Sequence, residues 1–266
     1  MSREAAAEKF YSDIEETARL VGVDCSRERI SPILSAYRDA FVEGGIVFSV
    51  DATRRHVGEL NYAFTVPPAI DDPYAHALSN GFVAETDHPV SAVLSDVRAR
   101  FAIAEHLVDC GVVGGFRKLY AHFPRDLRNV SEIADIPSMP PAVADNVGLF
   151  TRYGLCNVAM IGVNYAQKTV SVYSLRANLT LGWDSSEILR IALAPPPRRG
   201  LDPSAVPVRI EPNIERFATS SPRVYPGERV NLFAVKWTPA AEYLEVCSYY
   251  KLTPMLEKLF VENHEK

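Results

Sequence analysis

The stretch IVFSVDATRRHVGELNYAFTVP, residues 46–67, decides the fold class of this chain. Two segments within it, IVFSVD and ELNYAFTVP, alternate apolar and polar residues as strands do, and the polar turn at residues 53–55 predicts that they form a hairpin. The second segment has one apolar and one polar face: Leu60, Tyr62, Phe64 and Val66 against Asn61, Ala63 and Thr65. The apolar face of such an antiparallel sheet is buried under helices, so the polar face must lie elsewhere.

Helical and strand-like segments alternate on both sides of this hairpin. Residues 5–20, 27–42, 73–78 and 89–106 have helical spacing, whereas FRKLYAHF (116–123) is a strand pattern. Two further hairpins follow, pairing residues 158–165 with 168–175 and 179–184 with 187–194. A strand at RVNLFAVKWT (229–238) precedes a final helix predicted from Pro239 to about His264. The recurrence of helices followed by paired strands indicates an internal αββα repeat.

These repeats predict an α+β protein with one domain spanning residues 1–266. Because the apolar strand faces lie under helices, the polar faces converge on a solvated lumen if the sheet closes. The expected fold is an antiparallel β-barrel surrounded by a ring of helices. This arrangement is the reverse of a parallel (β/α)₈ barrel, whose centre is packed.

Composition and motifs exclude several other classes of protein. The net charge is −5 without a run of like charges, which argues against a broad nucleic-acid or membrane-lipid surface. The four cysteines form no CxxC pair, and the six histidines show no metal spacing. No GxGxxG, GxxxxGK[ST] or GxSxG motif is present, and no segment is apolar enough to span a membrane. We expect a cytoplasmic monomer.

The polar strand faces carry residues that suit binding of an anion. Lys118 shares a face with Tyr120 and His122, so an ammonium and a hydroxyl can hold a phosphate together. Arg190 lies among aliphatic residues, where a guanidinium usually needs an anionic partner, and Lys236 is a third such cation. The competing interpretation makes Lys118 a surface lysine with a buried stem and makes tyrosines such as Tyr173 part of the core.

With these residues in view, the sequence resembles the soluble aromatic prenyltransferases of the ABBA (PT-barrel) family, in particular their bacterial naphterpin-type branch. The resemblance extends over most of the chain. The matching stretches are FVEGG (41–45), VFSV (47–50), GELNYAFTVP (58–67), DPYA (72–75), GGFRKLYAHFP (114–124), IPSMPPAVADN (136–146), LFTRYGL (149–155), TLGWD (180–184), YPGER (225–229) and TPAAEYLEVCSYYKLT (238–253).

The resemblance implies a ten-strand barrel and a reaction in which an isoprenoid diphosphate, dimethylallyl or geranyl, ionises and alkylates an electron-rich aromatic ring. Fixed cations would stabilise the leaving diphosphate, and aromatic faces would shield the allylic cation. The residues that it places at the diphosphate are Ser49, Lys118, Tyr120 and Arg190. To these we add Asn61, at the position of the family's metal-binding aspartate, and Lys236, as a cation that compensates for missing lysines. Those that it places in the aromatic-substrate pocket are Met160, Ser171, Tyr173 and Tyr249. Lys118, Tyr120 and Arg190 are the expected catalytic residues.

Three positions depart from the family pattern. Asn61 stands where magnesium-dependent relatives have an aspartate, and a neutral amide is a poor Mg²⁺ ligand. We therefore expect no metal and no cofactor. Gln167 and Glu245 replace two lysines of the family, so part of its positive charge is absent.

The chain also departs from the family in length. Relatives insert roughly one repeat, about forty residues, where this chain runs from Ser174 to Leu179, which suggests a missing segment near 174–179. Two rival functions follow from these departures. One is a non-catalytic protein that binds aromatic ligands in the same barrel, and the other is a lumenal hydrolase of phosphorylated small molecules.

Overall fold

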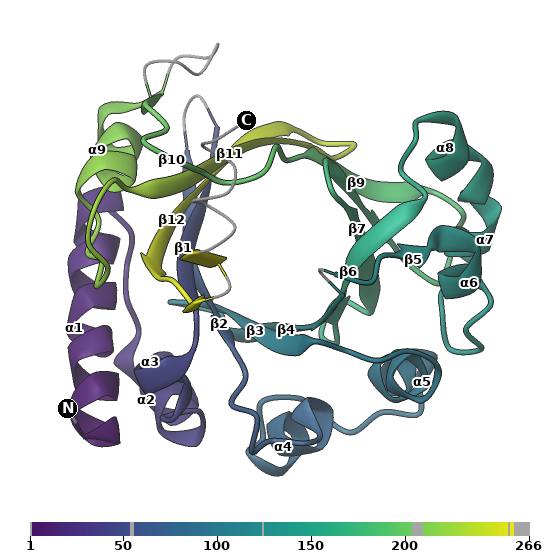
Figure 1. The fold of residues 1–266 in the computed structure, drawn as a ribbon, viewed down its shortest axis with the longest axis horizontal. Helices are drawn as coiled ribbons and strands as arrows, with labels where there is room; N and C mark the ends of the chain where they lie inside the picture. Colours follow the sequence, from purple (N-terminus) through teal and green to yellow (C-terminus); the bar gives the residue numbers. More distant parts are fainter. Residues whose placement is uncertain (1, 54–55, 124, 204–209, 255, 258–266) are drawn as a thin grey trace.

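The computed structural model describes residues 2–53, 56–123, 125–203, 210–254 and 256–257. Ten antiparallel strands form a closed barrel around an open centre (Figure 1). In ring order they are β1 (Ile46–Ala52), β2 (Val57–Thr65), β3 (Glu105–Gly111), β4 (Gly115–His122), β6 (Asn157–Asn164), β7 (Thr169–Ser174), β8 (Ala177–Leu181), β9 (Ile188–Leu193), β11 (Val230–Trp237) and β12 (Glu242–Lys251). The pairing of β9 with β11 closes the ring, as the sequence predicts.

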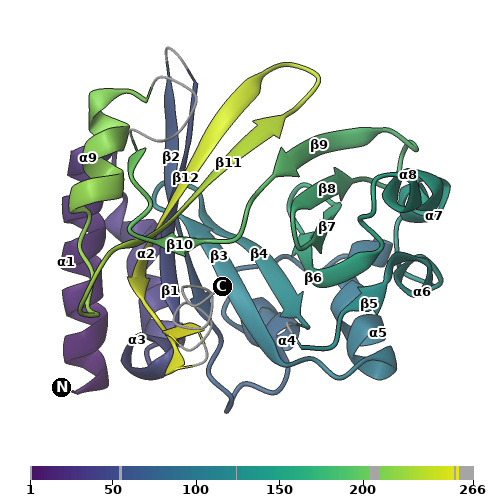
Figure 2. The ribbon, with the colours of Figure 1, turned by 45° about the horizontal axis from the view of Figure 1, so that its top comes forward.

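Helices lie outside the barrel (Figures 1 and 2). Four of them occupy one side: α1 (Arg3–Val21), α2 (Arg27–Ala36), α3 (Ala40–Glu43) and α9 (Pro212–Ser220). Helices α4 (Pro73–Ser79) and α5 (Val93–Arg100), with the 3₁₀ turn Pro89–Ser91, lie beyond β3 and β4. Helices α6 (Val130–Ala134), α7 (Pro141–Asp145) and α8 (Val147–Arg152) flank β6. Two short strands lie outside the ring: β5 (Arg128–Asn129) pairs with β6, and β10 (Arg198–Arg199) pairs with β11.

The first hairpin has the face pattern that its sequence predicts. Ser49 pairs with Asn61 and Phe48 with Tyr62, so like faces meet across the two strands. Phe48, Tyr62 and Phe64 are fully buried under the helices, where the ring of Phe10 stacks on Phe48 with centroids 5.7 Å apart. The opposite face, with Asn61 and Ala63, lines the lumen. Burial of the aromatic face therefore fixes which residues the barrel encloses.

The predicted helix from Pro239 to about His264 is wrong over its central part, because residues 242–251 form strand β12. Its side chains alternate strictly: Glu245, Cys247 and Tyr249 line the lumen, and Val246 and Tyr250 pack into the outer core. This period of two outweighs the helix propensity of the glutamate and leucine residues in the segment. Residues 258–264 of the predicted helix lie outside the described residues.

The predicted helix at 89–106 is also too long. Helix α5 ends at Arg100, and strand β3 begins at Glu105, a strand that the sequence pattern did not reveal. Residues 27–42 likewise form two helices, α2 and α3, rather than one. The extra strand supplies Glu105 and Asp109 to the lumen.

One side of the barrel differs from the rest. Strand β7 ends at Ser174 and β8 begins at Ala177, so no helix separates these two strands. Within the described part of the chain, Figure 1 shows no helix over β9 or over the end of β11 that pairs with it, whereas the start of β11 is bonded to α9 through Asn231. Large apolar side chains are exposed on the outer face of these strands, namely Leu189, Ile191, Leu193 and Trp237. The predicted missing segment near 174–179 stays a prediction, but this uncovered face lies on the barrel side that follows it in sequence.

Candidate active site

The lumen contains two connected chambers. The first has a volume of about 330 Å³, within the range of small-molecule sites, and is lined by Ile46 and His122 among others. The second is lined by His56, Gln167 and Tyr243, among others. Five residues line both chambers, and we call them the waist: Asp51, Asn61, Arg117, Arg190 and Lys236.

A β-bulge places two consecutive cations in the lumen. Asp109 of β3 pairs with Lys118 of β4, but the next residue, Cys110, pairs with Phe116, so Arg117 has no partner on the opposite strand. A bulge of this kind redirects a side chain that regular alternation would send outward. The Arg117 guanidinium consequently lines both chambers and donates a hydrogen bond to Oδ1 of Asn61.

Lys118 lines the first chamber beside the waist residue Arg117, and its ammonium is unpaired. The residue is 5 % exposed, and its Nζ has no hydrogen-bond partner among the described residues. Burial, reinforced by the positive charge of Arg190, lowers the pKa of Lys118 to about 7. An incoming anion would reverse this shift, since an opposite charge favours the protonated form.

Arg190 is the second cation without a carboxylate partner. Its Nη2 donates to Oγ1 of Thr180 at 3.1 Å, and Thr180 in turn shares a hydrogen bond of 2.8 Å with Ser171. The Nε atom of Arg190 is buried and has no partner within the described residues. A half-buried guanidinium whose Nε–H group is unused is suited to bind an anion in the lumen.

Lys236 has the opposite electrostatic environment. Its Nζ donates to Oδ1 of Asp51 at 2.9 Å and to Oε1 of Glu245 at 2.6 Å. Burial alone would lower the pKa of Lys236, but the two carboxylates raise it above the ordinary value. The charge of Lys236 is therefore already balanced by the protein.

Aromatic side chains form one wall of the first chamber. The rings of Tyr120 and Tyr173 meet edge to face with centroids 5.9 Å apart, and the Tyr120 hydroxyl donates to Asp109 at 3.3 Å. Gly162 makes this arrangement possible, because a Cβ there would lie 2.6 Å from the Tyr120 ring. Burial raises the pKa of Tyr173, so its hydroxyl stays protonated and available as a donor.

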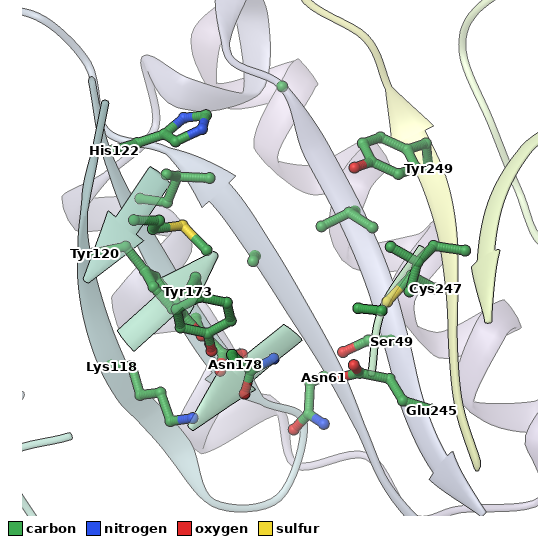
Figure 3. A pocket seen from close by; sticks show the side chains of 18 of the residues that line it. Ser49, Asn61, Lys118, Tyr120, His122, Tyr173, Asn178, Glu245, Cys247 and Tyr249 are labelled. Atoms are coloured by element: carbon green, nitrogen blue, oxygen red, sulfur yellow. Dashed lines mark hydrogen bonds between the residues drawn. The ribbon is translucent and has the colours of Figure 1, made fainter. Parts of the chain in front are cut away.

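Nine of the ten predicted site residues line the first chamber. They are Ser49, Asn61, Lys118, Tyr120, Met160, Tyr173, Arg190, Lys236 and Tyr249. Figure 3 shows Lys118, Tyr120 and Tyr173 across the cavity from Ser49, Glu245 and Tyr249. Ser171 is the exception, because it lines neither chamber and is 1 % exposed. It pairs with Thr180 on the neighbouring strand β8. It contacts Arg190 only indirectly, through Thr180.

Sequence reasoning missed several polar residues of the lumen, among them Arg117, Glu105, Asp109 and Asn178. Arg117 was hidden by the bulge, since strict alternation assigns it to the outer face. Glu105 belongs to a strand that was interpreted as helix, and Asn178 lines the first chamber from the start of β8. Glycine pairs such as Gly114–Gly115 beside a strand are a signal for a bulge or tight turn. Within the described residues no group of three or more His, Cys, Asp or Glu side chains could hold a metal ion.

The fold and the lumen define a class: a closed antiparallel barrel that can hold an anion at unpaired cations and an apolar molecule beside them. The model of the family named aromatic prenyltransferase Orf2 matches residues 5–178. With about two thirds of its length matched in this way, the chain belongs to that family of aromatic prenyltransferases.

Curated relatives with this similarity are enzymes of Streptomyces. The chain is 35 % identical to the 5,10-dihydrophenazine-1-carboxylate 9-dimethylallyltransferase of Streptomyces anulatus, over 97 % of this chain and 98 % of the relative. It is 34 % identical to the flaviolin linalyltransferase of Streptomyces virginiae, covering 94 % of each. It is 31 % identical to the furaquinocin biosynthesis prenyltransferase of Streptomyces sp. (strain KO-3988), over 91 % and 89 %.

These comparisons favour catalysis over a non-catalytic binding role. The alignment with the Streptomyces anulatus enzyme spans 297 positions, more than the 266 residues of this chain, so that relative has residues that this chain lacks. No helix in the described part of the chain is long and apolar enough to cross a membrane.

Proposed function

We propose that the enzyme transfers a dimethylallyl or geranyl group from its diphosphate to a hydroxylated aromatic small molecule, without a metal ion. The observation that carries the proposal is a pair of lumen cations, the buried Lys118 and the half-buried Arg190, that have no carboxylate within hydrogen-bonding distance among the described residues. Both lie where the apolar chamber meets the waist. A diphosphate bound there would leave its prenyl chain in the first chamber.

The waist would assist departure of the diphosphate. As the allylic C–O bond breaks, negative charge grows on the bridging oxygen, and Lys118 and Arg190 supply fixed positive charge where it develops. Arg117 adds a third cation from the bulge. Because these groups already line the first chamber, little reorganisation accompanies the step.

The first chamber would hold the aromatic acceptor. Tyr120 and Tyr173 present ring surface beside Lys118, and Met160 and Tyr249 line the same chamber. Aromatic faces attract a carbocation through their π electrons and keep water from it. The acceptor ring would attack the allylic carbon from the side of the chamber opposite the waist.

Arg117 supports the metal-free part of the proposal. Its guanidinium occupies the neighbourhood of Asn61, where it accounts for the amide oxygen. Asp109, the nearest other lumen carboxylate on β3, faces Lys118 and accepts from Tyr120. Cationic side chains thus stand where a metal would have to bind.

A direct assay tests this function. The protein is incubated with dimethylallyl or geranyl diphosphate and 1,3-dihydroxynaphthalene, with and without EDTA, and the products are weighed by mass spectrometry. A prenyl mass increment that persists in EDTA supports the proposal. Diphosphate release without an alkylated product would instead indicate a hydrolase.

We also propose that the enzyme acts as a monomer in the cytoplasm. Its four cysteines are free thiols, which is typical of a reducing compartment. Sedimentation equilibrium at micromolar concentration tests the monomer, and a mass of twice 29.5 kDa would contradict it.

A further inference from the structure

The end of the first chamber away from the waist contains a histidine and a glutamate in contact. Nδ1 of His122 on β4 lies 2.8 Å from Oε1 of Glu105 on β3, and the two residues pair across the hairpin. Both line the first chamber, and their side chains are 22 % and 20 % exposed. Figure 3 shows the His122 ring at the edge of the cavity, on the same side as Tyr120.

This contact fixes the protonation pattern of the imidazole. A carboxylate only accepts hydrogen bonds, so Nδ1 of His122 must carry the hydrogen, and in the neutral ring Nε2 is then the basic atom. Nε2 has no partner among the described residues. Glu105 would also stabilise the positive charge that His122 acquires when Nε2 takes a proton.

Apart from Glu105, the side chains named below bring no charge to the imidazole ring of His122. The titratable side chains that line this chamber with His122 include Tyr120 on the same strand and Tyr249 on β12 across the cavity (Figure 3), and burial raises the pKa of each, so both stay neutral. The β6 residue paired with His122 is Met160, which carries no charge. Glu105 is therefore the charged group that contacts His122.

The spacing along β4 suits two substrates in line. Lys118 and His122 are separated by four residues on one strand face, which corresponds to about 13 Å at about 3.3 Å per residue. That length accommodates the allylic carbon next to the bound diphosphate and an aromatic ring beyond it. The far edge of the ring would then meet His122.

From this geometry we infer that His122, positioned by Glu105, is the base that accepts the proton of a ring hydroxyl of the acceptor. This inference rests on the proposed function, because it assigns a further residue to that reaction. The deprotonated ring is a far better nucleophile than the neutral phenol. Nothing in the diphosphate site performs this role, since its free side chains are cations.

The proton and electron movements balance. The hydroxyl proton moves to Nε2 of His122, a ring carbon uses its electron pair to bond the allylic carbon, and the C–O bond breaks with its electrons leaving on diphosphate. The product of this step is a neutral dienone. Loss of the ring proton to solvent and return of the His122 proton to the oxygen restore the aromatic phenol.

The test compares two acceptors, 1,3-dihydroxynaphthalene and 1,3-dimethoxynaphthalene, with dimethylallyl diphosphate as donor. With the dihydroxy acceptor, His122→Gln should lower kcat by at least ~10²-fold, the usual contribution of a general base. With the dimethoxy acceptor, which has no hydroxyl proton, the same variant should change kcat less than about 3-fold. Glu105→Gln should lower kcat at least ~10-fold with the dihydroxy acceptor alone, because an amide no longer stabilises the imidazolium.

The pH profile provides a second readout. Wild-type kcat/KM for the dihydroxy acceptor should fall toward acid, and this limb should vanish in His122→Gln. His106→Gln is the matched control, because His106 lies on the same hairpin but binds the backbone oxygen of Tyr120. Its acidic limb should match that of the wild type.

The outcomes distinguish a failure of the proposed prenyl transfer from a failure of the role assigned to His122. If the wild type alkylates no acceptor, the proposed function fails. If the wild type is active but His122→Gln keeps its kcat and its acidic limb, or loses equal activity with both acceptors, His122 is not the base. Circular dichroism melting curves identify any variant whose loss arises from misfolding.

Discussion

The two sides of the waist hold the same residue type in opposite states. On the β11–β12–β1 side, Lys236 forms ion pairs with Asp51 and Glu245, and it is 7 % exposed. On the β4–β9 side, Lys118 is 5 % exposed and stands beside Arg190 with no carboxylate bonded to either. The two lysines are thus about equally buried, and they differ in whether a carboxylate pairs with them. The comparison teaches that a buried lysine stabilises the fold when carboxylates of the protein balance its charge. A buried lysine without such carboxylates is available to bind an anionic ligand.

The largest expected effect concerns the unpaired side. Lys118→Met and Arg190→Met should each lower turnover by at least ~10²-fold, because each removes a fixed cation from the developing diphosphate charge. Melting temperature should hold or rise in Lys118→Met, since a buried ammonium without a partner is lost. Steady-state kinetics and thermal melts check both points, and near-normal kcat in either variant would remove that residue from the diphosphate site.

The paired side should respond in the opposite way. Lys236→Met leaves the partly exposed carboxylates of Asp51 and Glu245 side by side without a counter-charge, so the free energy of unfolding should fall by about 1–3 kcal/mol. Urea denaturation measures this loss. Adding Asp51→Asn and Glu245→Gln to the same chain should restore most of it, and a triple variant as unstable as the single one would contradict the ion-pair explanation.

The lowered pKa of Lys118 makes diphosphate binding depend on pH, which gives a second test of the unpaired side. Because the pKa is about 7 in the free enzyme and a bound diphosphate favours the charged form, binding above pH 7 requires uptake of one proton. Diphosphate affinity should therefore fall by up to ~10-fold per pH unit between about pH 7 and 9. Calorimetry in two buffers of different ionisation enthalpy should detect the proton, and Lys118→Met should abolish it.

The same pKa affects stability with a defined sign. The folded state binds fewer protons at Lys118 than the unfolded chain between pH 7 and 10.5, so the contribution of this residue to stability rises with pH in that window. Lys236, whose pKa is raised, contributes stability below its unfolded pKa and loses it as pH rises through the folded value. A pH series of melts on the two methionine variants separates these opposite trends.

The smallest expected effect concerns Asn61. Wild-type turnover should survive EDTA, and Asn61→Asp should lower it about 3- to 10-fold, because the new carboxylate would pair with Arg117 and withdraw that cation from the diphosphate. Added Mg²⁺ should recover part of the loss in this variant only. Abolition of wild-type turnover by EDTA, with rescue by Mg²⁺, would overturn the metal-free proposal.

The sequence predicts the barrel and most of its lumen because strand periodicity is a local signal. Asn61, Lys118 and Tyr173 occupy the predicted face, since each strand buries its aromatic or aliphatic side outward. The sequence predicts Lys236 as a cation of the diphosphate site, but its ion pairs are not foreseen, because Asp51 lies 185 positions away in the chain and Glu245 falls in the segment predicted as helix. Contacts of that range depend on strand order around the ring.

Local irregularities account for the other differences. The bulge that turns Arg117 inward is a register shift between two strands, which periodicity within one strand cannot reveal. Strand β12 was misread because its glutamate and leucine residues favour helices when considered one at a time. Recognising β3 would have placed Glu105 next to His122.

The ladder between β9 and β11 has a further consequence. Three residue pairs join these strands, Val235 with Leu193, Lys236 with Ala192 and Trp237 with Ile191, whereas seven join β11 to β12. No described helix packs over this short ladder, which we call the seam (Figure 1). We expect local opening of the barrel to begin there, because few hydrogen bonds and few packing contacts oppose it. Amide protons along the seam should exchange with deuterium earlier than those of β1 and β2, and each opening would bring solvent to the ammonium of Lys236. The ring is therefore continuous in its hydrogen bonds but uneven in local stability.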